Sequence, residues 1–327
     1  MSKISKIAVI TSGGDAPGMN AAIRAVVRTG IYNGLEVYGV KYGYRGLIYD
    51  DIFKMDTKSV ANIIQRGGTV LKTARSKEFY EKEGRAKAYK NVKKHGIDGI
   101  IIIGGDGSFK GALAFSQEYD IPCIGLPGTI DKDMSGTDLT IGFDTAVNTA
   151  VDAIDKIRDT ADAHDRLFIV EVMGRDAGYI ALNSGISSGA EHILVPEKEA
   201  NAEDIIDSLK ANQRRQKLVN IIIVAEGVVS SCNATQLTQI IKEKAPKYDT
   251  RLCILGHIQR GGSPTYTDRL LASELGFAAV ESLIKEQKSY MIGRINNELK
   301  YTPLKEATKA SKGISEKWFR LANILAS

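Results

Sequence analysis

The chain alternates short, wholly apolar runs with longer segments in which apolar residues recur every three or four positions. Two of the runs, residues 7–12 and 99–103, consist mainly of isoleucine, valine and alanine. Continuous runs of this kind are typical of strands that are buried on both faces of a parallel sheet. Further strands are predicted at residues 35–40, 123–126, 167–172, 218–224 and 251–255.

Helices are predicted between these strands. Residues 17–29 form one of them, with Pro17 in the first turn, where a helix tolerates proline. Ser108 is expected to cap a helix that runs to Tyr119, and Asp144 to cap the next one. That helix carries apolar residues at helical spacing, namely Val147, Val151, Ile154 and Ile157. Strands that alternate with helices predict an α/β fold with parallel sheets.

The apolar runs at residues 7–12 and 99–103 each lead into a glycine–aspartate loop. Residues 13–18 read GGDAPG, and residues 104–108 read GGDGS. A glycine turn at the end of a strand lets a phosphate approach backbone N–H groups, with a helix N-terminus behind it. Two such loops suggest an extended phosphate-bearing ligand lying across the sheet. The alternative is that both are simple strand-to-helix turns.

Neither loop matches a standard nucleotide motif. Met19 and Asn20 stand where a P-loop requires lysine and then serine or threonine. Gly105, Gly107 and Gly111 are spaced wrongly for a dinucleotide fingerprint. If the two loops bind phosphate, they therefore do so as neither a P-loop nor a dinucleotide-binding loop. An aspartate between two glycines is able to hold Mg²⁺ on a polyphosphate, because Mg²⁺ takes one or two carboxylates plus phosphate oxygens.

A pair of carboxylates follows the predicted strand 123–126. Asp131 and Asp133 alternate with other residues in the segment PGTIDKD, residues 127–133. In an extended segment these two side chains point the same way. One of them would accept a proton from a substrate hydroxyl while the other orders the metal shell. A solvated acidic turn is the alternative for this spacing.

Arginines occur in two further glycine-rich loops that follow apolar strands. Arg175 lies in residues 171–178, and Arg260 lies in residues 255–264. An arginine so placed binds a phosphate through two N–H groups. His257, in the second loop, is either a structural histidine or a donor to a phosphate or sugar.

Composition narrows the class of protein. The 327 residues are 43% hydrophobic and 25% charged, with a net charge of +5. This excess of basic over acidic residues is small, and no cluster of lysines and arginines with interspersed aromatic residues appears. Nucleic acid is therefore not expected as a partner. Three cysteines without metal spacing predict a cytoplasmic protein. No run is long enough for a membrane span, and the apolar run at the start is too short for a signal peptide.

Five motifs together resemble the bacterial ATP-dependent 6-phosphofructokinase family. They are TSGGDAPGMN at 11–20, GGDGS at 104–108, PGTID at 127–131, MGR at 173–175 and GHIQRGG at 256–262. They occur in the family's order and span nearly the whole chain. The resemblance implies phosphoryl transfer from Mg-ATP to the 1-hydroxyl of fructose 6-phosphate in glycolysis.

The resemblance also implies residue roles. Asp131 would be the general base, with Arg75, Thr129 and Asp133 as further catalytic residues. ATP would contact Gly14, Arg75, Ser76, Gly105, Asp106, Gly107 and Ser108, with Asp106 near Mg²⁺. Fructose 6-phosphate would contact Thr129, Ile130, Asp131, Met173, Gly174, Arg175, Glu226, His257, Ile258, Gln259 and Arg260, and also Arg166 and Arg251 of a neighbouring subunit.

The family's architecture implies two α/β domains with largely parallel sheets and an active site in the cleft between them. The nucleotide-binding domain would comprise residues 1–142 and 259–309, and the sugar-phosphate domain residues 143–258 and 310–327. A homotetramer with shared active sites is expected. A site for a phosphorylated effector, ADP or phosphoenolpyruvate, is expected from a further set of residues: Arg24, Arg28, Arg158, Gly189, Glu191, Arg215 and Lys217.

Some positions depart from the family pattern. Lys132 stands where the family usually has asparagine, and Ser76 and Lys77 replace an apolar residue and a proline. Asp51 falls where some relatives carry a basic residue of the effector site. The pair Arg24 and Arg28, one helical turn apart, would alone be only a solvated basic face.

Three other functions compete with this one. A pyrophosphate-dependent relative usually has a bulkier aspartate and a lysine where this chain has Gly107 and Gly128. Both glycines are expected to leave room for the α-phosphate of ATP. A lipid or NAD kinase would leave residues 127–131 and 256–262 unexplained. A nucleotide-sensing binding protein would have lost the base, whereas Asp131 is present.

Overall fold

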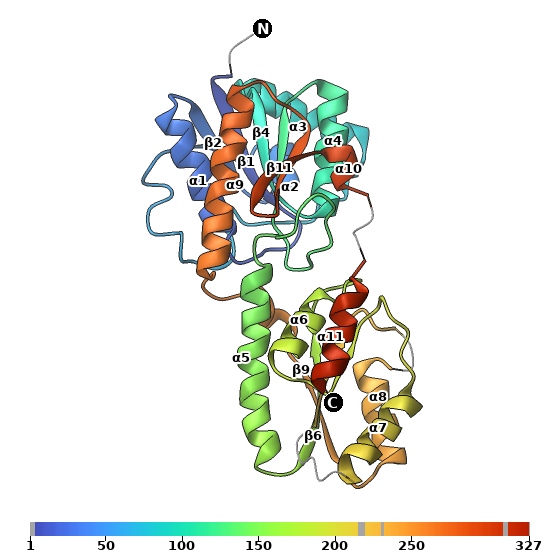
Figure 1. Ribbon diagram of the computed structural model, residues 1–327. Helices are drawn as coiled ribbons and strands as arrows, with labels where there is room; N and C mark the ends of the chain where they lie inside the picture. Colours follow the sequence, from blue (N-terminus) through green and yellow to red (C-terminus); the bar gives the residue numbers. More distant parts are fainter. Residues whose placement is uncertain (1–3, 215–219, 230–231, 310–312, 327) are drawn as a thin grey trace. The chain divides into compact units, whose positions relative to one another are not determined.

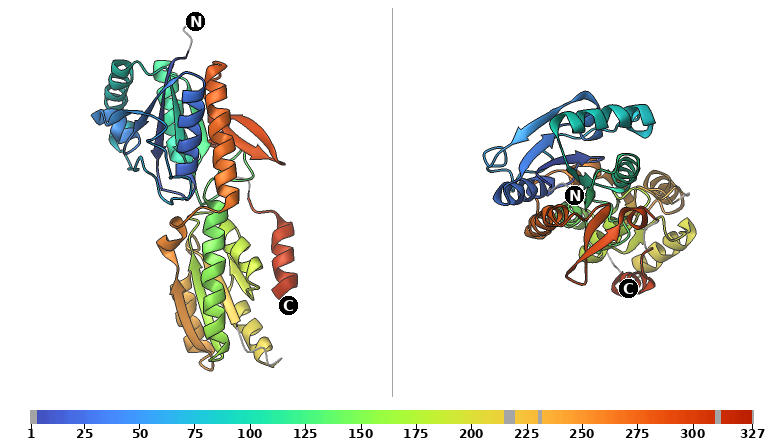
Figure 2. Two further views of the ribbon diagram at one scale, coloured as in Figure 1. Left: turned by 90° about the vertical axis from the view of Figure 1, so that its left-hand side faces the viewer. Right: turned by 90° about the horizontal axis from the view of Figure 1, so that it is seen from above.

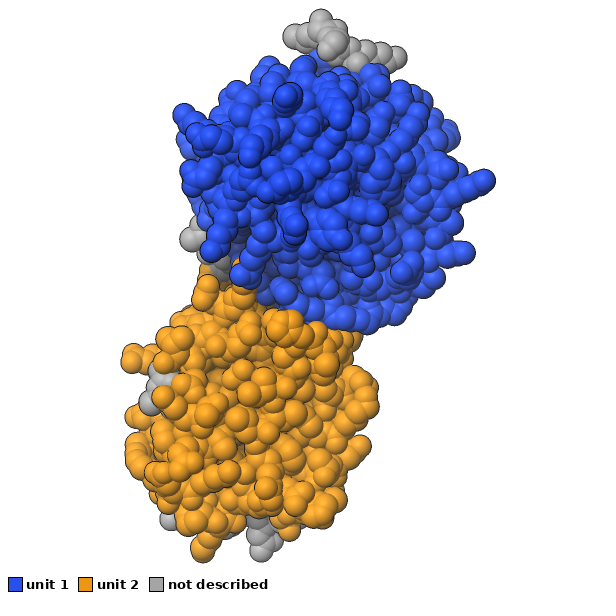
Figure 3. All heavy atoms as spheres, turned by 180° about the vertical axis from the view of Figure 1, so that it is seen from behind, with its two compact units in different colours: residues 1–145, 260–312 blue, residues 146–259, 313–327 orange. Residues whose placement is uncertain are grey.

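The computed structural model describes residues 4–214, 220–229, 232–309 and 313–326. They form two compact units, residues 1–145 with 260–312 (unit 1) and residues 146–259 with 313–327 (unit 2) (Figure 3). Each unit contains its own sheet with helices packed around it (Figure 1). The predicted α/β class with largely parallel sheets is confirmed. The assignment of nucleotide and sugar phosphate to separate units stays a prediction.

Unit 1 is assembled from segments at both ends of the sequence. Its elements are β1 (Lys6–Ser12), α1 (Met19–Tyr32), β2 (Glu36–Val40), α2 (Tyr44–Tyr49), β3 (Ile52–Met55), the 3₁₀ helix η1 (Glu78–Tyr80), α3 (Lys82–His95), β4 (Gly99–Gly104), α4 (Asp106–Tyr119), β5 (Cys123–Pro127), α9 (Tyr266–Ile284), β10 (Tyr290–Ile295), β11 (Glu298–Pro303) and α10 (Leu304–Ala307). The long helix α5 (Phe143–Asp162) begins in this unit and continues into unit 2.

The seven strands of unit 1 follow the order β11-β10-β5-β4-β1-β2-β3. The five central strands are parallel, and the two edge strands, β3 and β11, run antiparallel to their neighbours. Strand order reverses between β1 and β4, because β2 follows on one side of β1 and β4 lies on the other. Ligands of open α/β sheets bind beyond the carboxyl ends of the strands at such a reversal.

Helices cover both faces of this sheet (Figures 1 and 2). On one face, buried side chains of β4 such as Ile100 and Ile102 join a core with Phe109 and Phe115 of α4. On the other face α1 and α9 pack closely, since a Cβ on Gly276 would lie only 2.7 Å from the Cβ of Ala25. The continuous apolar character of β1 and β4 follows from burial on both faces.

Three predicted helix starts are wrong by one to three residues. The first helix begins at Met19, because Gly18 before it has φ +106° and Pro17 therefore precedes the helix. The helix after β4 begins at Asp106 with Gly105 as N-cap, so Ser108 is inside it. Asp144 lies within the first turn of α5 and is not its cap.

Unit 2 is smaller and contains a four-stranded parallel sheet of order β7-β8-β6-β9. Its elements, besides most of α5, are β6 (Arg166–Val172), α6 (Tyr179–Ser187), β7 (His192–Leu194), α7 (Ala202–Arg214), β8 (Asn220–Ala225), α8 (Ala234–Lys244), β9 (Asp249–Ile254) and α11 (Glu316–Ala326). The 3₁₀ helix η2 (Gly256–Arg260) follows β9. Predicted residues 218 and 219 lie outside the described residues.

The three cysteines are free thiols, as the sequence predicts. Cys123 and Cys232 are buried and Cys253 is partly exposed, and burial raises the pKa of the Cys123 thiol to about 12. Among the described residues, no helix combines the length and the hydrophobicity that a membrane crossing needs.

Candidate active site

The two glycine loops of unit 1 lie side by side where the strand order reverses. Ser12 and Gly104, the last residues of β1 and β4, are register partners. A Cβ on Gly104 would lie 2.5 Å from the carbonyl oxygen of Ser12 and 2.6 Å from Oγ of Ser108. Only glycine permits this close approach. The two loops therefore share one edge of the sheet, at the carboxyl ends of its strands.

Gly107 and Gly128 differ in the space around them. A Cβ on Gly107 would meet no heavy atom within 4 Å, so this position is open, as expected. A Cβ on Gly128 would lie 2.9 Å from Cγ2 of Ile103 and 3.1 Å from Cε of Met19. Close packing against these two side chains therefore explains why this position is a glycine. The expectation that Gly128 leaves room for a ligand stays a prediction.

Asp106 is suited to holding a metal ion on a ligand phosphate. It is the first residue of α4, its side chain is 37% exposed, and Oδ2 accepts from Nζ of Lys110 at 2.6 Å. The described residues contain no cluster of three or more metal-ligating side chains. Mg²⁺ needs only one or two carboxylates when phosphate oxygens complete its shell, so one aspartate beside the open Gly107 fits.

One arginine contacts the first glycine loop, and another lies on a segment that is hydrogen-bonded to it. Arg75 and Ser76 lie on a segment that Thr73 ties to this loop, because Oγ1 of Thr73 donates to the carbonyl of Gly13 at 2.8 Å. Arg260 lies directly on Gly14, where a Cβ would be 2.2 Å from its guanidinium. The buried Nε of Arg260 has no hydrogen-bond acceptor among the described residues. Such a donor at a glycine loop suits an anion.

The loop after β5 holds the predicted base. Asp131 is only 4% exposed, and its backbone N–H donates to Oγ1 of Thr129 at 3.2 Å. Lys132 has φ +56°, in the left-handed region. The segment is therefore not extended, and the expectation that Asp131 and Asp133 point the same way for that reason is wrong. Ile130 beside them is buried.

Lys132 is held against an aromatic ring within this loop. Its Nζ lies 4.8 Å from the centroid of the Phe143 ring, a cation–π distance. Burial lowers the pKa of Lys132, and the charge of Asp138 opposes this shift. The lysine that departs from the family pattern thus has a defined place in the structure.

In unit 2, Glu226 organises the loop that follows β6. Its Oε1 accepts from the backbone N–H of Gly174 at 3.1 Å and of Arg175 at 2.8 Å. Gly174 and Arg175 have φ of +139° and +52°, so this hydrogen bonding holds an uncommon backbone conformation. Burial, together with the charge of Glu226, raises the pKa of the neighbouring Glu171.

The loop after β9 meets the same edge of this sheet. Gln259 is fully buried; its Oε1 accepts from the N–H of Met173 at 3.3 Å, and its Nε2 donates to the carbonyl of Gly256 at 3.0 Å. Its side chain therefore joins the loops after β6 and β9. His257 and Ile258, next to it, are exposed. The structure brings five predicted sugar-phosphate residues to one edge: Met173, Gly174, Arg175, Glu226 and Gln259.

Arg166 and Arg251 lie away from that edge. Both bind Asp249, at 2.8 Å from Nε of Arg166 and 2.9 Å from an NH group of Arg251. The hydrogen bond from Arg166 holds the pKa of Asp249 below its usual range, with burial opposing it. Arg166 begins β6 and Met173 follows its end, about 20 Å along a strand of this length. The two therefore cannot contact one small ligand within the same copy of unit 2.

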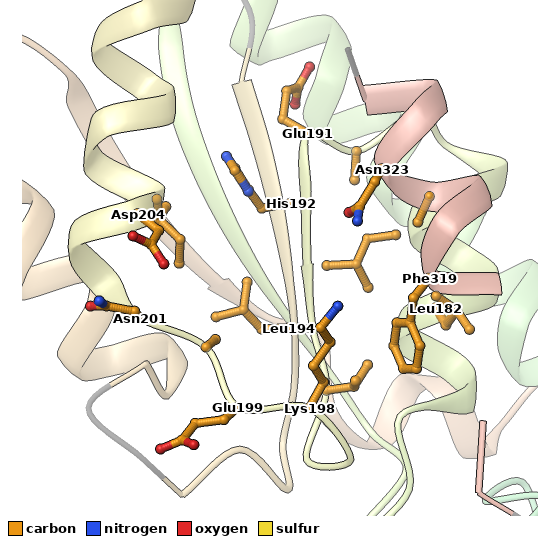
Figure 4. Close-up of a pocket in the computed structure, with 16 residues that line it drawn as sticks. Leu182, Glu191, His192, Leu194, Lys198, Glu199, Asn201, Asp204, Phe319 and Asn323 are labelled. Carbon is orange, nitrogen blue, oxygen red and sulfur yellow. The ribbon is translucent and has the colours of Figure 1, made fainter. Parts of the chain in front are cut away.

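The predicted effector residues are only partly placed. Arg158 donates to the carbonyls of Ser188 at 2.5 Å and Gly189 at 3.0 Å, and Oε2 of Glu191 accepts from the N–H of Ile221 at 2.5 Å. Glu191 lines one end of a cavity of about 220 Å³ in unit 2, with Glu199 at the other end (Figure 4).

Within the described residues, the structure does not bring the other predicted effector residues together, so the effector site stays a prediction. Arg24 and Arg28 share a face of α1 in unit 1, one helical turn apart as expected. Arg215 and Lys217 lie outside the described residues. Asp51 is exposed and its backbone pairs with Gly46 and Lys41.

Sequence reasoning missed residues that organise these loops. No sequence motif marked Thr73 or Asp249, because the residues that they contact are distant in the sequence. Asp268 is fully buried and bonded to residues 142 and 145. The pattern Thr265-x-x-Asp268 is that of a helix start, and Oγ1 of Thr265 does accept from the N–H of Asp268.

The fold and the loops define a class of protein: an α/β protein with a doubly wound sheet and glycine loops at its strand reversal. The family described as phosphofructokinase matches residues 6–283, and the chain belongs to this family. Two relatives illustrate the likeness. ATP-dependent 6-phosphofructokinase 2 of Bacteroides thetaiotaomicron is 52% identical over 325 residues, 99% of this chain and 98% of the relative. ATP-dependent 6-phosphofructokinase 1 of Thermus thermophilus is 53% identical over 323 residues, 99% and 100% of the two chains.

Solved structures agree with this membership. The phosphofructokinase of Saccharomyces cerevisiae superposes with a TM-score of 0.88 at 39% identity, covering 98% of this chain and 48% of that chain. The pyrophosphate-dependent phosphofructokinase of Marinobacter aquaeolei gives a TM-score of 0.87 at 22% identity, covering 99% and 92%. At that identity the second likeness shows the fold alone.

Proposed function

We propose that the chain transfers the γ-phosphoryl group of Mg-ATP to the 1-hydroxyl of fructose 6-phosphate, giving fructose 1,6-bisphosphate and ADP. The observation that carries this proposal is the shared edge of the unit 1 sheet. There, two glycine loops, the open Gly107 and the buried Asp131 follow neighbouring strands. A cytoplasmic location agrees with three free thiols.

The residues of unit 1 divide the chemistry between them. Backbone N–H groups of the loops at 13–14 and 104–108, with Ser108 and Ser76, would bind the phosphates of ATP. Bound Mg²⁺, held by Asp106, would neutralise charge on the polyphosphate. Asp131 would take the proton from the attacking hydroxyl. Arg75 would offset the charge that builds on the transferred group, with Thr129 and Asp133 ordering the surroundings.

The residues of unit 2 would hold the sugar phosphate. Glu226 fixes the backbone of Gly174 and Arg175, and Gln259 fixes that of Met173. This rigidity presents the side chain of Arg175 and the exposed His257 and Ile258 to a ligand at the carboxyl edge of the sheet. Arg260, a residue of unit 1 that lies against Gly14, is a further proposed ligand of the sugar phosphate.

The phosphoryl donor is the sharpest test. Initial rates with fructose 6-phosphate as acceptor are expected to be much higher with Mg-ATP than with Mg-pyrophosphate, because Gly107 leaves space and adds no charge. Comparison of kcat/KM for the two donors measures this. Equal or better turnover of pyrophosphate would overturn the assignment. Binding of both ligands without turnover would instead favour a nucleotide-sensing protein.

We infer that the chain acts as a homotetramer in which two copies complete each sugar-phosphate site. Arg166 and Arg251 lie toward the amino ends of β6 and β9, whereas Met173 and Glu226 follow the carboxyl ends of β6 and β8. If these arginines bind the same phosphate, as the family pattern implies, they come from another copy.

Mixed oligomers test this sharing. Chains with Asp131→Ser and chains with Arg251→Ala are each expected to be nearly inactive as pure oligomers. Unfolding the two together and reassembling them should restore part of the activity, because some hybrid sites contain both intact groups. Each variant reassembled alone is the control. Hybrids verified by mass that regain no activity would contradict shared sites.

A further inference from the structure

A buried carboxylate that the mechanism does not use lies behind the loops of unit 1. Asp268, in the first turn of α9, is 1% exposed. Its Oδ1 accepts from the N–H of Gly142 at 2.8 Å. Its Oδ2 accepts from the N–H of Thr145 at 2.9 Å and from Oγ1 of Thr145 at 2.5 Å. One carboxylate thus accepts hydrogen bonds from three donors at the start of α5, one just before the helix and two in its first turn.

That segment is in turn paired with the loop that carries the predicted base. The N–H of Ile141 donates to the carbonyl of Pro127 at 2.8 Å, and Gly128 and Ile141 form a parallel bridge. The N–H of Gly128 donates to the carbonyl of Gly104 at 3.0 Å. Asp131 follows three residues after Gly128. Displacement of residues 141–142 would therefore move the start of the 127–133 segment.

The same residues contact the first glycine loop. A Cβ on Gly142 would lie 2.7 Å from the Cβ of Ala16, and a Cβ on Gly18 would lie 2.7 Å from Cγ2 of Ile141. The ideal Cβ of Gly18 is also 3.5 Å from Cβ of Asp268. The loop after β1, the segment 141–145 and α9 therefore meet at Asp268.

The chemistry of the cluster requires the ionised form of Asp268. A carboxylate only accepts hydrogen bonds, whereas a protonated carboxyl presents a donor to a neighbour that is itself a donor. Burial raises the pKa of Asp268 to about 6, the hydrogen bonds from Thr145 and Gly142 opposing this and the charge of Asp144 adding to it. At pH 7.5 the group is ionised and accepts all three bonds.

We propose that Asp268 is a positioning residue for the phosphoryl transfer, fixing through residues 141–145 where Asp131 stands relative to the glycine loop after β1. The proposal rests on the proposed function, because it assigns Asp268 a part in that reaction. A misplacement of a reacting group by about 1 Å costs on the order of 10²-fold in rate.

The test replaces Asp268 with asparagine at pH 7.5. Asparagine has nearly the same size but offers one acceptor oxygen in place of two, so one donor of Thr145 or Gly142 loses its partner. We expect kcat to fall about 10–100-fold while KM for each substrate changes less than about 3-fold. In an Asp131→Asn background the same change should lower kcat far less, because its effect passes through Asp131. An equal loss in both backgrounds would overturn the proposal.

Thr265→Ala is the matched control. Oγ1 of Thr265 donates to Asp144 and accepts from the N–H of Asp268, so this variant weakens the same helix start and leaves the three bonds to the Asp268 carboxylate in place. We expect a lower thermal midpoint with kcat within about 3-fold of the unmodified chain. If Asp268→Asn does not fold, Thr145→Val is the second variant, which removes one donor to Asp268 and also the acceptor of the Thr265 N–H. It should lower kcat by about 3–10-fold, and an unchanged kcat would contradict the proposal.

Hydrogen exchange separates this proposal from the proposed function. Amide N–H groups of Ile141 and Gly128 should exchange faster in Asp268→Asn than in Thr265→Ala, whether or not the chain turns over ATP. If the unmodified chain shows no phosphoryl transfer but these amides still exchange faster in Asp268→Asn, the proposed function is overturned. The structural link from Asp268 to the segment 127–133 then still holds. Unchanged exchange at these two amides would overturn the link itself.

Discussion

Replacing Asp131 with asparagine is expected to lower kcat by about 10²–10⁴-fold, with a modest change in KM for fructose 6-phosphate. The hydroxyl that attacks the phosphoryl group must lose its proton, and an amide of the same shape cannot accept it. Asp131 is 4% exposed and is bonded through its backbone to Thr129. Steady-state kinetics with saturating Mg-ATP measure the loss.

Asp138→Asn is the control for this variant, because it removes an exposed carboxylate from the same segment. It is expected to retain kcat within about 3-fold. If Asp131→Asn keeps most of its turnover, the base lies elsewhere, and Asp133 is the first residue to examine.

Placing an aspartate at Gly107 should lower kcat/KM for ATP by about 10²–10³-fold. The position is open and lies in the first turn of α4, where an acidic side chain is tolerated, so we expect the variant to fold. A carboxylate about 4 Å from a ligand phosphate costs on the order of 4 kcal/mol at the effective dielectric of a protein surface. Part of this penalty is relieved by rotation of the side chain into solvent.

Gly107→Asn separates charge from bulk, because asparagine has the size of aspartate without its charge. If charge decides, the asparagine variant should lose at most about 10-fold in kcat/KM for ATP. Equal losses in the two variants would show that volume alone matters. An aspartate variant within about 3-fold of the unmodified chain would remove Gly107 from the nucleotide site.

The strands of the two sheets were predictable because burial on both faces leaves a clear pattern. β1 and β4 appear in the sequence as continuous apolar runs, and each was predicted to within a residue. The glycine loops at their ends were predictable for the same reason, since a glycine after a buried strand marks a turn. Short edge strands such as β3 and β7 give no comparable signal.

Helix starts and loop conformations were less predictable. Ser108 resembles a cap in sequence, but the backbone turns into α4 two residues earlier and Ser108 packs against Gly104. The left-handed φ of Lys132 has no sequence signature, because lysine rarely adopts it. The close packing of Gly128 against Ile103 and Met19 also has no signature in the sequence.

The remaining features that the sequence did not predict depend on contacts between segments that are distant in the sequence. The bonds from Asp268 to Gly142 and Thr145 join residues more than 120 positions apart. The pairs that Asp249 makes with Arg166 also depend on strand register, which one sequence does not reveal. A spacing pattern predicts which side chains share an element, whereas only the fold shows which elements meet.

The discontinuous construction of unit 1 bears on how the chain matures during synthesis. Protein emerges from the ribosome in sequence order, and domains generally fold as units. The four strands of unit 2 are complete once Ile254 has been made, whereas β5 of unit 1 still lacks its partner β10 and one sheet face still lacks α9. The sheet of unit 1 is therefore started before the sheet of unit 2 and completed after it. Until α9 and β10 have been made, the free edge of β5 and the apolar surface of α1 are exposed. During this interval the nascent chain is most prone to aggregation and most accessible to chaperones.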